Sequence, residues 1–168
     1  DHGLLPIALV KFGKSKKVLA CDVNPLPLEK AHENIESQGL SSYIDTVLTN
    51  GAIGLDGKAD EFIIAGMGGE LISTIIEDSP FLKNENVHLV LQPMTKQKEL
   101  REYLWNNGFE IEKESYLFEG HYYTVMSVSY IGKKTEYTPL DLEIGKEKNL
   151  NTEEKISLVG IIKEKLSD

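Results

Sequence analysis

The stretch Glu61-Phe62-Ile63-Ile64-Ala65-Gly66-Met67-Gly68-Gly69-Glu70-Leu71-Ile72 decides the fold of this chain. An apolar run typical of a β-strand leads straight into a glycine-rich turn, and a helix with apolar periodicity follows at once. In an open α/β sheet ligands bind at such a corner, because glycines let the backbone turn tightly and let a ligand approach it. A tight turn without any ligand gives the same pattern, so the rest of the chain has to decide between the two.

Strand and helix signals alternate on both sides of this corner. Before it we expect a helix over 4–12, a strand over 17–23, a helix over 25–38 and a strand over 45–49. After it we expect helices over 69–78 and 96–107, a strand over 87–92, and two long strands over 110–119 and 122–131. This order predicts an α/β fold with a mostly parallel sheet, helices on both faces and a closing antiparallel hairpin.

The length of 168 residues predicts one main domain, which we place at residues 1–132. Residues 133–168 are mixed and charged, and we expect them to be peripheral, with a helix over 152–166. The opening residues 1–6 read like the middle of a motif. We therefore expect a first strand upstream of Asp1, a missing segment near residues 149–152, and an incomplete C-terminal helical extension.

The composition is that of a globular protein, with 40% hydrophobic and 27% charged residues. No apolar run approaches the ~20 residues of a membrane span, and no secretory signal is visible. The single cysteine, Cys21, fits a cytoplasmic protein, and its apolar surroundings predict an inert thiol in the core. The net charge of -9 argues against a broad basic face that holds nucleic acid.

Candidate functional residues gather where the strands end, because parallel strands present their carboxyl ends at one edge of a sheet. Asp22 lies 19 residues after Gly3, the spacing at which a carboxylate grips the ribose of an adenosine-containing cofactor. A helix-capping Asp or Asn before Pro25 is the alternative, and both roles can hold together. Asn50 and Gly51 could place an amide near an adenine edge or form an ordinary turn.

Four segments together resemble a known family. They are Asp1-His2-Gly3-Leu4-Leu5-Pro6, Asp22-Val23-Asn24-Pro25, Ala65-Gly66-Met67-Gly68-Gly69 and Leu91-Gln92-Pro93-Met94, in this order and spacing. Over about residues 1–130 the chain resembles the TrmK family, bacterial tRNA (adenine-N1)-methyltransferases that modify adenosine 22 of tRNA. That family begins its first motif with Asp-Ile-Gly-Ser-Asp-His, and this chain matches from the second aspartate. The family also carries a C-terminal helical coiled-coil domain.

The resemblance implies a class I methyltransferase with a Rossmann-like sheet that uses S-adenosyl-L-methionine as cofactor, takes tRNA as its partner and needs no metal. Its cofactor-binding residues would be Gly3, Asp22, Val23, Asn50, Gly51, Ala65, Gly66 and Met67. Asp1 would be the catalytic or base-orienting carboxylate. His2 would contact the base or the cofactor, although a structural role in holding the loop is equally open.

The substrate side follows the fifth strand of such a sheet. Gln92, Pro93 and Met94 would face the target base, although the family often has Asn where this chain has Met94. The loop 51–54 also departs from the family's Gly-Asp-Gly-Leu type of run. Lys96, Lys98 and Arg101 should rim the active-site face and contact phosphates, or else form a solvated helix face. Lys14, Lys16 and Lys17 lie at the other end of the sheet.

Aromatic residues give a weaker signal. Phe118, Tyr122 and Tyr123 could stack a base, but packing on the sheet face is the simpler interpretation. We expect Trp105 in the core. A small-molecule methyltransferase would suit the acidic surface, and a nucleotide-binding module without turnover would use the same fold. The sequence fixes neither the oligomeric state nor the preferred tRNA.

Overall fold

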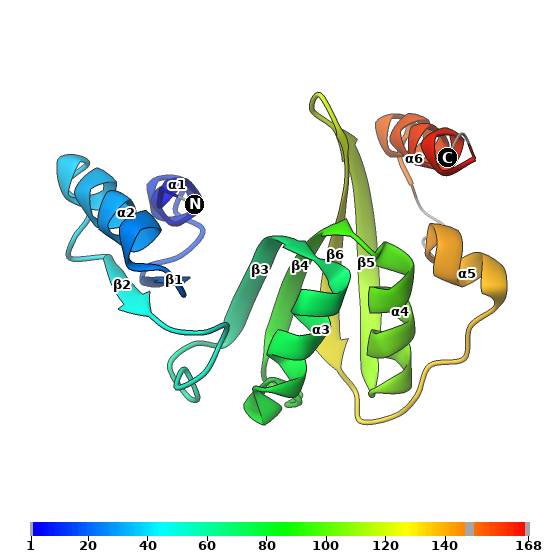
Figure 1. The fold of residues 1–168 in the computed structure, drawn as a ribbon, viewed down its shortest axis with the longest axis horizontal. Helices are drawn as coiled ribbons and strands as arrows, with labels where there is room; N and C mark the ends of the chain where they lie inside the picture. The colour runs from blue at the N-terminus through cyan, green and yellow to red at the C-terminus, as the bar shows by residue number, and fades with distance from the viewer. Residues whose placement is uncertain (1, 147–149, 167–168) are drawn as a thin grey trace. The chain divides into compact units, whose positions relative to one another are not determined.

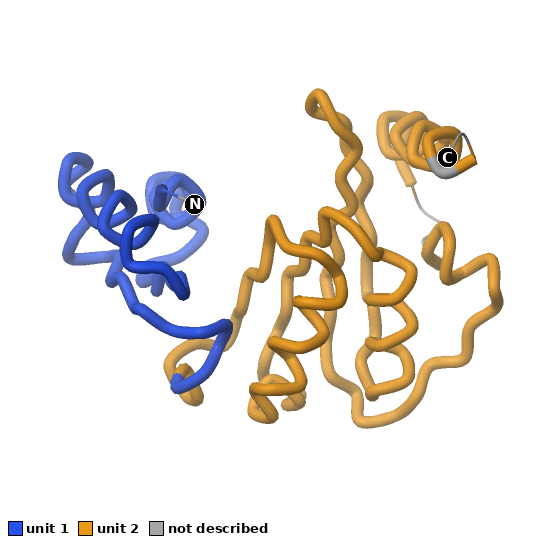
Figure 2. Tube along the Cα trace, in the orientation of Figure 1, with its two compact units in different colours: residues 1–54 blue, residues 55–168 orange. Residues whose placement is uncertain are grey.

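The computed structural model describes residues 2–146 and 150–166 of the chain. The chain divides into two compact units, residues 1–54 and residues 55–168 (Figure 2). Each unit has its own sheet, and the helices and strands are labelled in Figure 1.

The first unit packs two helices against a two-stranded parallel sheet. Its elements are α1 (Leu4–Lys11), β1 (Val18–Asp22), α2 (Pro25–Ser37) and β2 (Ile44–Leu48). The strands pair in register from Val18 with Ile44 to Asp22 with Leu48. Ala31 and Ile35 lie four residues apart on α2, so they share one helix face and pack with Ala20 and Ile44 in a small core.

The second unit is built on a four-stranded sheet in the order β3-β4-β6-β5. Its strands are β3 (Glu61–Gly68), β4 (His88–Thr95), β5 (Phe109–Phe118) and β6 (Tyr122–Tyr130). β3 and β4 are parallel, whereas β6 runs antiparallel to both β4 and β5. The β5–β6 connection turns at Gly120, whose φ of 72° lies in the left-handed region that glycine adopts readily.

Helices cover one face of this sheet. α3 (Gly69–Glu77) and α4 (Gln97–Asn106) lie side by side there (Figure 1), and the short 3-10 helix η1 (Pro80–Leu82) follows α3. The core between helices and sheet consists of side chains with at most 2% exposure, among them Ile72, Ile76, Leu89, Leu91, Leu100, Leu104, Trp105, Phe109, Met126 and Val128. Burial of this apolar area is the main force that stabilises the unit.

Two further helices follow the sheet, α5 (Pro139–Ile144) and α6 (Thr152–Lys165). Each begins with a capping box, in which the first side chain and the acid three residues later exchange hydrogen bonds with the backbone. α6 packs against β5, where Tyr122 of the neighbouring β6 approaches Gly160 so closely that a Cβ at that glycine would overlap the ring.

The predicted α/β fold with parallel strands and a closing antiparallel hairpin is confirmed, and the element bounds agree within a few residues. Trp105 is buried as expected, with 1% exposure. Three features differ. The described strands form two sheets rather than one, α5 was not expected, and Cys21 is exposed because it alternates with Ala20 and takes the face of β1 away from the core.

The domain boundary at residue 132 stays a prediction, since the compact units divide after Gly54. Within the described ranges, no helix combines the length and apolarity that crossing a membrane requires.

Candidate active site

In the first unit, the carboxyl ends of β1 and β2 bring Asp22 beside residues 49–51. The carbonyl of Asp22 accepts the Thr49 N–H at 2.9 Å. The Oδ1 atom of Asp22 accepts the Asn24 N–H at 2.8 Å, which orients the carboxylate before the helix begins at Pro25. This turn is not a helix cap, because Asn24 occupies the N-cap position of α2 and makes no side-chain capping hydrogen bond. Because only Oδ1 takes part in it, the geometry suits a carboxylate that receives hydrogen bonds from a diol.

The loop before α1 packs on α2. Gly3 has a φ of 71°, and a Cβ there would meet Cβ, Cα and the carbonyl oxygen of Ala31 at 3.2–3.3 Å. The His2 carbonyl accepts a hydrogen bond from the Asn34 side chain at 2.8 Å, so this backbone is anchored to the helix. A hollow of about 370 Å³ opens beside it and is lined by His2, Asn24, Pro25, Leu26, Pro27 and Lys30.

The loop after β2 has two well-defined turns. Gly51 adopts a φ of 59°, and the Asn50 carbonyl accepts the Ile53 N–H at 3.3 Å. The Thr49 hydroxyl donates to the Ile53 carbonyl at 2.8 Å, which closes the loop. Asn50 is exposed, as is Val23 at 57%, so both side chains face outward where a ligand could reach them.

In the second unit, the corner between β3 and α3 is irregular at its centre. The β3–β4 register shifts between Ala65 and Met67, and Gly66 between them has a φ of 76°. The Gly66 N–H donates to the side-chain carbonyl of Gln92 at 2.9 Å. A Cβ at Gly66 would meet nothing within 4 Å, so the glycine borders open space as a ligand-facing backbone would.

The next two glycines allow a close approach between the two corners that end β3 and β4. A Cβ at Gly69 would lie 2.3 Å from the Lys96 carbonyl oxygen, and one at Gly68 would lie 3.2 Å from the Thr95 hydroxyl. Lys96 itself has a φ of 60°, which is strained for a residue with a side chain. Gly69 therefore lets the start of α3 pack directly against the start of α4.

In the Gln92-Pro93-Met94 segment, the polar groups of Gln92 and Pro93 form hydrogen bonds to other residues of the protein. The side-chain NH₂ group of Gln92 donates to the Met94 sulfur at 3.3 Å, and its side-chain carbonyl accepts the Gly66 N–H. Pro93 is buried, and its carbonyl accepts a hydrogen bond from the Gln97 side chain at 3.3 Å; its contact with a substrate stays a prediction. Met94 is 47% exposed and remains available to a substrate.

Two of the three basic residues after β4 are exposed and paired. Lys96 lies 3.0 Å from Glu99, and this hydrogen bond raises the pKa of the lysine. Lys98 pairs with Glu143, which raises its pKa in the same way. Both ammonium groups therefore stay charged, and such exposed pairs are weak enough for a phosphate to displace the carboxylate.

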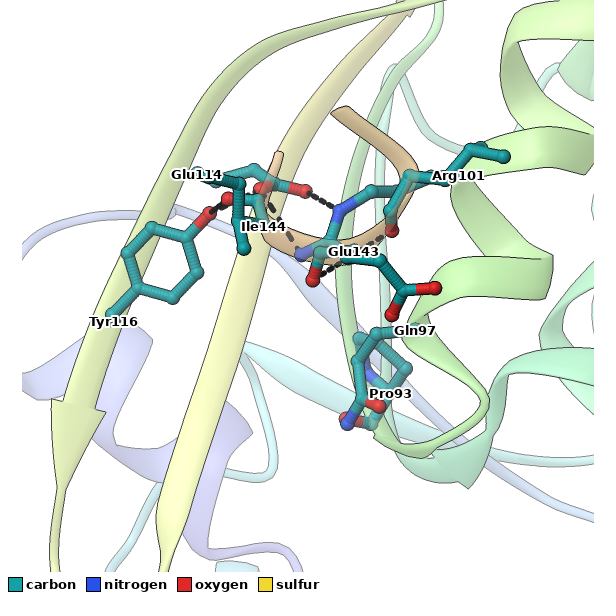
Figure 3. Close-up of polar contacts among 8 residues, drawn as sticks. Pro93, Gln97, Arg101, Glu114, Tyr116, Glu143 and Ile144 are labelled. Atoms are coloured by element: carbon teal, nitrogen blue, oxygen red, sulfur yellow. Dashed lines mark hydrogen bonds and ion pairs between the residues drawn. The ribbon is translucent and has the colours of Figure 1, made fainter. Parts of the chain in front are cut away.

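The prediction that Arg101 contacts phosphate is wrong. Its side chain is 2% exposed, because its position on α4 follows the same buried face as Leu104 and Trp105. Its guanidinium donates to both carboxylate oxygens of Glu114, at 2.7 and 3.2 Å, and to the Leu142 carbonyl at 2.9 Å (Figure 3).

Tyr116 completes this buried cluster. Its hydroxyl donates to Glu114 and lies 2.8 Å from the Ile144 carbonyl (Figure 3). Burial and the neighbouring Glu114 carboxylate raise the pKa of Tyr116 far above its usual value, so the hydroxyl keeps its proton. The cluster joins α4, β5 and α5, which makes it structural.

Sequence reasoning placed most of the site residues at strand ends, and the structure brings them together within each unit. It missed the role of Gln92 in holding Gly66, because that hydrogen bond depends on a bulge that no local pattern shows. Asp1, the expected catalytic carboxylate, lies outside the described residues. Phe118 and Tyr122 pack on each other at 4.8 Å between ring centroids, with Phe118 exposed.

Comparison with known proteins gives one consistent set of relatives. Residues 1–126 match the family model described as "Methyltransferase domain". The tRNA (adenine(22)-N(1))-methyltransferase of Bacillus subtilis (strain 168) is 30% identical over 147 residues, 86% of this chain and 62% of the relative. The chain thus spans about three fifths of the length of this curated relative.

Two solved structures share the fold closely. A Streptococcus pneumoniae protein assigned as a tRNA (m1A22) methyltransferase, in complex with S-adenosyl-L-methionine, is 31% identical with a TM-score of 0.83. That match covers 99% of this chain and 76% of the other. M. capricolum TrmK in complex with S-adenosyl-homocysteine is 28% identical, also with a TM-score of 0.83, over 99% of this chain and 74% of the other.

Proposed function

Because the chain belongs to the methyltransferase-domain family and, within it, to the TrmK family of tRNA (adenine22-N1)-methyltransferases, we propose that it methylates N1 of an adenine in tRNA with S-adenosylmethionine. The observation that carries the proposal is the corner at Gly66, where the β3–β4 register is irregular and the Gly66 backbone borders open space. A tRNA substrate also implies a cytoplasmic location.

The residues present fit the cofactor. In residues 1–54, Asp22 would hold the ribose hydroxyls, and Gly3 lets the loop before α1 lie flat on α2. Val23, Asn50 and Gly51 would border the adenine. In residues 55–168, Ala65, Gly66 and Met67 would border the methionine part and the target base. The bound cofactor supplies an electrophilic methyl group on a sulfonium.

The chemistry asks little of the protein beyond position and charge. Adenine N1 carries a free lone pair at neutral pH, so no base is needed to uncover it, and orientation provides most of the rate. Methylation leaves positive charge on the ring, which the Asp1 carboxylate would stabilise, or else it would accept an N6 proton. Because N1 lies on the Watson–Crick edge, a paired or stacked target base must first be extruded.

The basic residues Lys96 and Lys98 would contact the tRNA backbone by exchanging their carboxylate partners for phosphates. A small-molecule methyltransferase is the second candidate, favoured by the net charge of -9. It would bind the cofactor in the same way but show no dependence on tRNA.

The test is methyl transfer from labelled S-adenosylmethionine to unmodified bacterial tRNA, followed by nucleoside analysis. We expect label in 1-methyladenosine, and we expect Asp22→Ala to weaken cofactor binding at least tenfold. Asp45→Ala, an exposed carboxylate on β2 paired with Lys17, is the matched control and should bind normally. Saturable cofactor binding without transfer to tRNA would favour the small-molecule alternative.

A further inference from the structure

We propose that the loop Lys11–Lys17, with the sequence KFGKSKK, is a second RNA-binding surface, which holds the phosphate backbone and stacks an unpaired base on Phe12. The proposal rests on the proposed function, because it gives an RNA-modifying enzyme a further contact with its substrate. The loop, called the basic loop below, connects α1 to β1 within the first unit (Figure 1).

The basic loop has a fixed backbone. The N–H groups of residues 12–15 donate to carbonyls of residues 8–10, at 2.8–3.2 Å. Gly13 takes the left-handed conformation with a φ of 65°, which is typical of a helix C-terminus. The Ser15 hydroxyl then donates to the Lys17 carbonyl at 2.7 Å. The side chains are therefore presented from an ordered surface, which lowers the entropy lost on binding.

Positive charge is concentrated in this loop. Residues 1–54 contain five lysines, and four of them lie within Lys11–Lys17. The ammonium of Lys11 contacts the neutral side chain of Gln38, which leaves its charge uncompensated. Lys17 lies 3.5 Å from Asp45, but both side chains are more than half exposed, so the pair is weak. Lys14 and Lys16 are exposed as well.

An aromatic ring stands in the middle of these lysines. Phe12 is 79% exposed, although a large apolar residue at a helix end commonly packs against its own helix. Tyr43, whose carbonyl accepts the Val18 N–H at 3.0 Å, is 48% exposed beside the loop's last residue. Exposed rings flanked by lysines suit unpaired nucleotides, because the ring stacks on a base while the ammonium groups reach its phosphates.

The position of the basic loop separates it from the methyl-transfer chemistry. It precedes the first residue of β1, whereas Asp22 ends the same strand, and a strand of this length spans about 13 Å. A structured RNA is wider than this distance, so one molecule can contact both ends of the strand. The basic loop would therefore position the RNA without touching the cofactor or the target base.

The test compares RNA binding by variants of the full chain. Lys14→Ala with Lys16→Ala removes two ammonium groups, and Phe12→Ala removes the ring. Lys133→Ala with Lys134→Ala removes an exposed lysine pair at the end of β6 and serves as the charge-matched control. The probes are unmodified tRNA, an unstructured RNA oligonucleotide and anionic phosphatidylserine vesicles, with binding measured by fluorescence anisotropy or by sedimentation with the vesicles.

We expect the Lys14/Lys16 variant to bind both RNAs roughly tenfold more weakly and to show a smaller dependence on salt, because fewer counterions are released. Phe12→Ala should weaken binding of the unstructured RNA and leave the salt dependence of binding nearly unchanged, because it removes a stacking ring and no charge. Cofactor affinity and the unfolding midpoint should stay unchanged in both variants.

Equal RNA binding by the wild type, both variants and the control would contradict the proposal that the basic loop binds RNA. It would leave the proposed function intact. Loop-dependent binding of vesicles without binding of RNA would also overturn it, in favour of a lipid surface. Loop-dependent binding of RNA without methyl transfer to tRNA would support the surface and count against the proposed function.

Discussion

At the residue scale, the Gln92 side chain supplies a hydrogen-bond acceptor that the irregular backbone of β3 lacks. The bulge in β3 leaves the Gly66 N–H without a ladder partner in β4, and the Gln92 carbonyl takes its place. The hydrogen bond fixes the backbone that the proposed cofactor would meet. We therefore propose that Gln92 is a positioning residue, which would act on the cofactor through Gly66.

Replacing Gln92 by Leu should weaken S-adenosylmethionine binding roughly fivefold, since one hydrogen bond contributes about 1 kcal/mol. Gln92→Glu keeps an acceptor for the Gly66 N–H and should restore most of the affinity at neutral pH. Titration calorimetry measures both. If the Leu and Glu variants lose affinity equally, Gln92 does not act through Gly66.

Arg101 and Glu114 form a buried ion pair, and removing one partner leaves the other charge unpaired. Arg101→Met should therefore lower the free energy of unfolding by about 3–5 kcal/mol, measured by urea denaturation. Adding Glu114→Leu should recover much of this loss. Lys98→Met, which breaks an exposed pair on the same helix, is the control and should change the free energy of unfolding far less. Equal losses for Arg101→Met and Lys98→Met would contradict the structural role.

At the element scale, the helices and strands could be predicted from local sequence patterns, whereas the hydrogen bonds and ion pairs between them could not. The strand-to-helix corners at residues 22–25 and 66–69 could be predicted from apolar runs next to Gly and Pro. The face of α4 carried a usable signal as well, because Arg101 precedes Leu104 and Trp105 at helical spacing. Its partner could not be found in this way, since Glu114 lies on β5 and the carbonyls come from α5.

The start of α6 gives a prediction about pH. The hydrogen bond from the Asn151 N–H lowers the pKa of Glu154, so the folded helix favours the ionised form. A lowered pKa means that the cap stabilises α6 above the ordinary pKa of glutamate, about 4.3, and that this stability is lost as pH falls through the lower folded value.

Glu154→Ala should destabilise α6 at pH 7, because it removes the carboxylate that accepts the Asn151 N–H. Hydrogen exchange, corrected for intrinsic rates, should show lower protection in α6, and the difference from the wild type should shrink under acidic conditions. Glu153→Gln changes the neighbouring acid outside the capping box and should have little effect. A Glu154→Ala effect of the same size at every pH would contradict the link between the stability of α6 and the Glu154 carboxylate.

At the scale of the whole molecule, charge and function have to be reconciled. The chain carries a net charge of -9, yet its family acts on tRNA. Two groups of basic residues are candidates for RNA contacts, the segment 96–98 after β4 and the basic loop before β1, and each contains only a few lysines. We expect tRNA binding to be weak, and we expect its dependence on salt to be modest, because few phosphates are contacted and few counterions are released.

The most direct test of the central claim is methyl transfer to two tRNA transcripts that differ only at position 22, one with adenine and one with guanine. With S-adenosylmethionine as donor, the account predicts 1-methyladenosine at position 22 of the first transcript and no 1-methyladenosine in the second. Equal methylation of both transcripts, or of neither while the cofactor still binds, would contradict it.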